Sequence, residues 1–91
     1  MNNKYETFFN FLGSRFPDMD FEGMSDEDVV KKYKQTINAA ELCIVVAEAQ
    51  EVRQRIEEYW KVIIKETNLY FKNSGEVLLW LDSIISLLKK G

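Results

Sequence analysis

Apolar residues recur along this chain at spacings of three and four, which is typical of helices, and no segment alternates as a strand does. The first apolar stripe comprises Tyr5, Phe8, Phe9 and Leu12. It predicts a helix over about residues 3–13. Gly13 is placed to end this helix, and Pro17 cannot continue it because proline has no backbone N–H to donate.

A second helix is predicted over about residues 26–37. Ser25 offers an N-cap, and Asp28 stands three residues later as a carboxylate variant of the capping box. Asp26 and Glu27 suit the positive end of the helix dipole. The side chains expected to be buried are Val29, Val30, Tyr33 and Ile37.

The central part of the chain carries one long helical stripe, from Asn38, a candidate cap followed by Glu41, to about Thr67. Its first inner face comprises Leu42, Val45, Val46 and Ala49, flanked by Cys43 and Ile44. The stripe continues through Val52, Ile56, Tyr59, Trp60, Ile63 and Ile64. Neither glycine nor proline interrupts it, but one unbroken helix would be long for a small domain. We therefore favour a break near residues 50–54.

The last helix is predicted over about residues 75–90, after a turn over residues 68–75 in which Ser74 is a candidate cap. Its apolar stripe comprises Val77, Leu78, Leu81, Ile84, Ile85 and Leu88. Lys89 and Lys90 then complement the negative end of its dipole. These elements predict an all-α fold, a compact bundle of four to five helices with no sheet, in a single domain over residues 1–91.

Charge is distributed unevenly along the 91 residues. Residues 1–30 hold two basic and seven acidic side chains, a net charge of −5, whereas the rest of the chain has a net charge of +2. An acidic protein with a pI of about 4.9 is poorly suited to bind nucleic acid directly, because phosphates attract basic surfaces. A basic protein partner fits this composition better.

Few residues offer catalytic or metal-binding chemistry. The chain has no histidine, and its four glycines form no phosphate-binding loop. Cys43 lies in an apolar helical run and is expected to be a buried structural cysteine. Asp18, Asp20, Glu22 and Gly23 match the first half of a calcium loop, but the twelfth position is Val29 instead of the bidentate glutamate. We therefore predict no enzyme activity, no metal site and no cofactor.

The segment between the first two predicted helices combines carboxylates with large apolar side chains. Capping of the second helix accounts for Ser25, Asp26 and Asp28. It does not account for three further acidic residues, Asp18, Asp20 and Glu22. The apolar residues Phe16, Met19, Phe21 and Met24 either tuck this segment onto the helices or stay exposed as anchors for a partner.

Several short motifs resemble one family along nearly the whole chain. They are Phe16-Pro17-Asp18-Met19-Asp20, then Ser25-Asp26-Glu27-Asp28-Val29-Val30-Lys31-Lys32-Tyr33, then Tyr70-Phe71 and the amphipathic helix from Glu76 to Leu88. This order resembles the small α-helical immunity proteins of bacterial contact-dependent growth inhibition systems. Met19 stands where a tryptophan is more typical of that family.

The resemblance implies a cytoplasmic, non-catalytic inhibitor that binds the C-terminal domain of a cognate toxin. Such toxin domains are commonly nucleases, whose active sites are basic. For the toxin of this chain we predict a ribonuclease in preference to a deoxyribonuclease. The implied toxin-binding residues are Asp18, Met19, Asp20, Phe21, Glu22, Asp26 and Glu27. Charge complementarity between these acids and a basic cleft would speed the encounter.

Two other interpretations remain open. A helical adaptor or regulatory subunit would bind its protein partner through an apolar groove near Trp60 and Trp80. A calcium- or magnesium-responsive protein would use the Asp18–Gly23 segment. The chain shows no apolar run after a basic N-terminus and no apolar stretch of about 20 residues, so we expect no membrane association.

Overall fold

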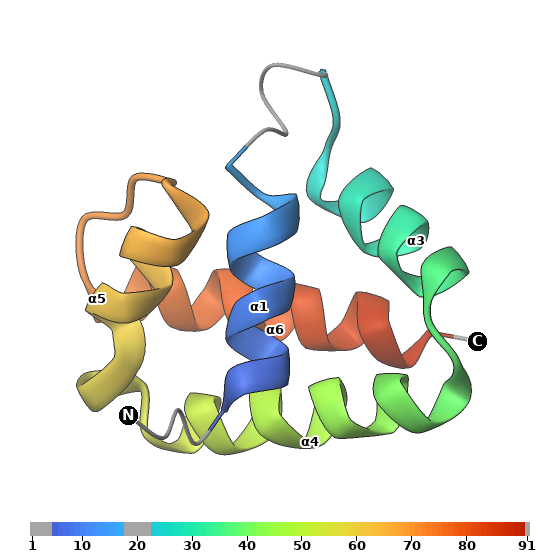
Figure 1. The fold of residues 1–91 in the computed structure, drawn as a ribbon. Helices are drawn as coiled ribbons and strands as arrows, with labels where there is room; N and C mark the ends of the chain where they lie inside the picture. Colours follow the sequence, from blue (N-terminus) through green and yellow to red (C-terminus); the bar gives the residue numbers. More distant parts are fainter. Residues whose placement is uncertain (1–4, 18–22, 91) are drawn as a thin grey trace.

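Helix α1 (Glu6–Arg15) lies in the middle of the fold, with α5 (Ile56–Thr67) on one side and α3 (Asp26–Thr36) on the other (Figure 1). Helices α4 (Ala39–Gln54) and α6 (Ser74–Lys89) run across the direction of α1. This computed structural model describes residues 5–17 and 23–90, and within these ranges it holds five helices and no strand. The predicted all-α bundle is therefore confirmed over the described residues.

The helix starts follow short-range hydrogen bonds, as the sequence predicts for two of them. Ser25 and Asp28 form both halves of the capping box, with N···O distances of 3.2 Å. Asn38 caps α4 by accepting a hydrogen bond from the backbone N–H of Glu41 at 2.8 Å. The predicted cap Ser74 is wrong by one residue, because the side chain of Asn73 accepts from the backbone N–H of Glu76.

Gly13 does not end α1, contrary to the expectation from sequence. The helix continues to Arg15, and the backbone N–H of Phe16 still donates to the carbonyl of Leu12. Gly13 instead faces α5, where a Cβ atom would lie 3.0 Å from the carboxylate of Glu66. The backbone carbonyl oxygen of Glu66 would lie 3.9 Å from that Cβ atom, an ordinary contact distance, so Gly13 is a contact position between α1 and α5. The helix ends shortly before Pro17.

The long central stripe breaks at Arg55, one residue beyond the predicted range. Arg55 has φ −114° and ψ 35°, outside the helical region, although its N–H still donates to Glu51 and Val52. Because of this break, α5 leaves the direction of α4 and packs against both α1 and α6. The break was therefore correctly expected, and it is what lets α5 close the bundle.

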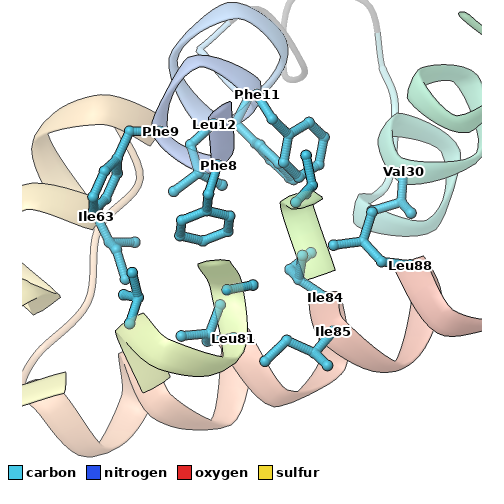
Figure 2. Close-up of a cluster of buried hydrophobic side chains, with 14 of the residues drawn as sticks. Phe8, Phe9, Phe11, Leu12, Val30, Ile63, Leu81, Ile84, Ile85 and Leu88 are labelled. Carbon is cyan, nitrogen blue, oxygen red and sulfur yellow. The ribbon is translucent and has the colours of Figure 1, made fainter. Parts of the chain in front are cut away.

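One cluster of buried apolar side chains lies between the helices (Figure 2). Its fully buried members include Phe8, Leu12, Val45, Ile63, Val77, Leu81 and Ile84. Phe16 is also buried, so the core interpretation holds for this residue, and Met24 packs partly against the cluster. Cys43 corrects another expectation: it is exposed, because it lies on the side of α4 opposite buried Val45 and Ala49.

Helix α1 has no capping side chain of its own, since Tyr5 at its N-cap position makes no side-chain cap bond. Its start is completed by α4 instead. The carboxylate of Glu48 accepts a hydrogen bond of 2.9 Å from the backbone N–H of Phe8, forty residues away in the chain. A negative side chain at this end also suits the positive pole of the α1 dipole.

Replacing Glu48 by alanine is expected to lower the free energy of unfolding by about 1–2 kcal/mol, because it leaves the Phe8 N–H without its acceptor. Glu48→Gln keeps an acceptor oxygen and should lose less than half as much. Urea denaturation measures both, with Glu51→Ala on the exposed side of α4 as the control. Equal losses for the alanine and glutamine variants would contradict the capping role.

Candidate partner-binding surface

Five of the seven predicted site residues, Asp18 to Glu22, lie outside the described residues. The other two, Asp26 and Glu27, occupy the first turn of α3. Glu27 is exposed, and Asp26 is partly buried. The structure therefore places one end of the predicted surface and leaves the assignment of residues 18–22 as a prediction.

The first turn of α3 gives its three acidic residues different environments. Asp28 is committed to the capping box through the backbone N–H of Ser25. Asp26 accepts a hydrogen bond of 3.0 Å from the indole Nε1 of Trp80, which lies on α6. Glu27 presents its carboxylate at the surface next to both. Only Asp28 is thus accounted for by local capping alone.

Trp80 is the side chain that holds this end of α3 against α6. Its ring contacts that of Phe16 at a centroid distance of 5.2 Å and that of Phe71 at 5.7 Å. Phe16 follows α1 and Phe71 lies in the loop before α6, so three parts of the chain meet at one indole. The position of the Asp26 carboxylate is therefore set by a packed aromatic cluster.

The C-terminal half of the same helix pair is held by Lys34. Its ammonium donates to the backbone carbonyls of Leu87, at 3.2 Å, and Lys90, near the end of α6. These carbonyls carry the negative pole of the α6 dipole, so a cation there is favourable. With Trp80–Asp26 at one end and Lys34 at the other, α3 is fixed along α6.

A shallow groove, here called the α3–α6 groove, opens on the surface between these two helices. Its lining residues are Ser25, Asp26, Glu27, Asp82, Ser83, Ser86 and Leu87. Three of them are carboxylates, and the others are mainly small hydroxyl side chains. Asp82 is paired with Arg53 of α4, which turns part of its charge toward that neighbour.

Asp82 is the residue that sequence reasoning missed. It lies 56 positions after Asp26, within the amphipathic α6, where a polar residue off the apolar stripe is unremarkable on its own. Only the packing of α3 on α6 brings it to the same groove as Asp26 and Glu27. Its negative charge was the only sign in the sequence that Asp82 could belong to an acidic surface. No neighbouring residue indicated that it lies close to Asp26 and Glu27.

The adaptor interpretation assigned Trp60 and Trp80 to one apolar groove, and the structure gives these two residues different surroundings. Trp80 is partly buried and belongs to the acidic surface through its bond to Asp26. Trp60 lies on α5, with the ammonium of Lys61 5.6 Å from its ring centroid. One residue of the predicted acidic site, Asp26, and one of the predicted apolar groove, Trp80, are therefore in direct contact.

The groove offers mainly hydrogen-bond acceptors. Within residues 5–17 and 23–90, no three histidine, cysteine or acidic side chains lie close enough together to hold a metal ion. Its carboxylates and hydroxyls can accept hydrogen bonds from lysine and arginine side chains, and these are charge-assisted when the carboxylate is ionised. Among the described helices, none has both the length and the apolar character that crossing a membrane requires.

Burial raises the pKa of the Asp26 carboxyl above its ordinary value, and the hydrogen bond from Trp80 opposes this by a smaller amount. The folded state therefore holds the proton of Asp26 more tightly than the unfolded state does. It follows that the contribution of Asp26 to stability is greatest at low pH and falls as pH rises through the raised pKa.

The Asp26→Asn variant keeps an oxygen that can accept from Trp80 but removes the titration. The difference in free energy of unfolding, variant minus wild type, is expected to become more positive between about pH 3 and pH 7. Thermal unfolding at a series of pH values measures this difference. A difference that moves in favour of the wild type would mean that the positive end of α3 outweighs burial of the charge.

No protein-family model, curated protein or solved structure matches this chain. The family named from the sequence motifs consequently remains a resemblance.

Proposed function

We propose that this chain is a cytoplasmic, non-catalytic inhibitor that binds a basic protein, the toxin domain of a contact-dependent growth inhibition system. We propose that this toxin domain is a nuclease, more specifically a ribonuclease. Binding would cover its basic active site. The contact would be made by the start of α3, together with the predicted residues 18–22.

The observation that carries this proposal is the grouping of Asp26, Glu27 and Asp82 around the α3–α6 groove. Asp26 lies there although burial disfavours its ionised form. A carboxylate that costs stability in the free protein gains a favourable partner when a cation of another protein pairs with it. Such an arrangement supports a role in recognition, which capping of α3 does not require of Asp26.

The acidic surface also fits the type of target. A nuclease active site must attract phosphates and therefore carries lysine and arginine side chains. Carboxylates presented on a rigid helix start can occupy the same cations and exclude the nucleic acid. Long-range attraction between the two charged surfaces raises the association rate, an advantage when a toxin must be neutralised soon after it arrives.

The proposal is tested by expressing the chain together with the product of the gene that precedes its own, where that gene encodes a toxin-like protein. The two proteins are expected to co-purify, and the chain should suppress the nuclease activity in proportion to its concentration, with full inhibition at one equivalent. A toxin-like product that stays fully active and unbound in the presence of excess chain would reject the inhibitor function. Stable capture of a regulatory or secretion component instead would support the adaptor interpretation.

A further inference from the structure

We infer that the partner binds along the outward face of α6, with Leu79 as its apolar anchor and with cations of the partner on both sides of this face. This inference rests on the proposed function, because it takes a basic toxin domain as the occupant. It extends the contact surface beyond the residues that the sequence motifs assign.

The outward face of α6 is defined by Leu79, Ser83 and Ser86, spaced at i, i+4 and i+7. These residues point away from the core, since the opposite face buries Leu81, Ile84 and Leu88. Leu79 is 70% exposed, which leaves a large apolar side chain in contact with water. A single exposed leucine is common, so its neighbours decide whether it has a role.

Three carboxylates lie among those neighbours, and one of them is paired with a cation of the chain itself. Ser83 and Ser86 line the α3–α6 groove and are one and two turns from Leu79. The carboxylates of Asp26 and Glu27 border the groove on the α3 side. Asp82 borders it on the α4 side, where it meets Arg53.

Each part of this face favours the same kind of occupant. The two serines are small, so a partner can approach the helix closely. The acids on either side favour lysine or arginine at the edges of the contact, and Leu79 favours an apolar side chain near its end. A basic protein surface with an apolar residue between cations is therefore complementary to it.

Binding of the purified toxin domain, measured by calorimetry, tests the inference. Leu79→Lys is expected to weaken binding by roughly a hundredfold, since it removes the anchor and adds a charge of the same sign as the partner. Leu79→Ala should weaken it by roughly tenfold, and Ser83→Trp, which fills the face, by a similar factor. The matched control is Ile44→Lys on α4, because Ile44 is also an exposed apolar residue, at 48%.

The possible outcomes separate the two proposals. If the wild-type chain binds and Leu79 and Ser83 variants bind as tightly as it does, the α6 contact is wrong while the inhibitor function stands. If the wild-type chain does not bind the toxin domain, both fail. Sedimentation of the chain alone tests whether a second copy occupies this face. A dimer that Leu79→Lys dissociates would assign the face to a second copy and overturn the inference.

Discussion

Replacement of Phe8 by alanine is expected to lower the free energy of unfolding by about 3–5 kcal/mol, a large part of the 5–15 kcal/mol typical of a domain. Phe8 is fully buried on α1, the helix that contacts α3, α4 and α5. Figure 2 shows its ring pointing into the cluster that also contains Leu81 and Ile84. Because several helices border the site, they cannot all move inward to fill the space that the ring leaves.

Thermal and urea denaturation measure this loss, and the thermal midpoint should fall by more than about 10 °C. The substitution leaves the backbone N–H of Phe8 in place, so the bond to Glu48 is not removed with the ring. Asn10→Ala, on the exposed side of the same helix, is the matched control and should change stability by less than about 0.5 kcal/mol. A loss below about 1.5 kcal/mol for Phe8→Ala would mean that this core is loosely packed.

The second large effect concerns association with the toxin domain. Glu27→Lys is expected to slow association at low salt by roughly tenfold, because it reverses an exposed charge that lines the α3–α6 groove. The effect should shrink as salt is added, since ions screen charges beyond about 10 Å at 0.1 M. Stopped-flow mixing at several salt concentrations gives both the rate and its salt dependence.

Two features of the chain make this experiment specific. Glu27 takes no part in the capping box, which uses Ser25 and Asp28, so its reversal leaves both hydrogen bonds of that box in place. Glu51→Lys on α4 changes the net charge by the same amount and lies away from the groove, so it should alter association by less than about twofold. Equal slowing by the two reversals would show that net charge, and not this surface, guides the encounter.

Most of the fold could be predicted from the sequence because helices are specified by interactions between residues three or four positions apart. The apolar stripe of α6 and the caps at Ser25 and Asn38 are examples of such local signals. The predictions were wrong where the end of a helix, or the side of it that is buried, depends on a neighbouring helix. Gly13 packs against Glu66 within α1 instead of ending it, and Cys43 faces solvent although its local surroundings are apolar.

The candidate surface was predictable only in part. The sequence by itself determined the helices, two of their caps and an acidic start of α3. The tertiary structure alone decided that Trp80 binds Asp26, that Asp82 reaches the same groove and that this groove lies beside the outward face of α6, which carries Leu79. The physical reason is that periodicity tells which side of a helix is buried, whereas the angle and register at which two helices pack depend on every side chain in the shared core.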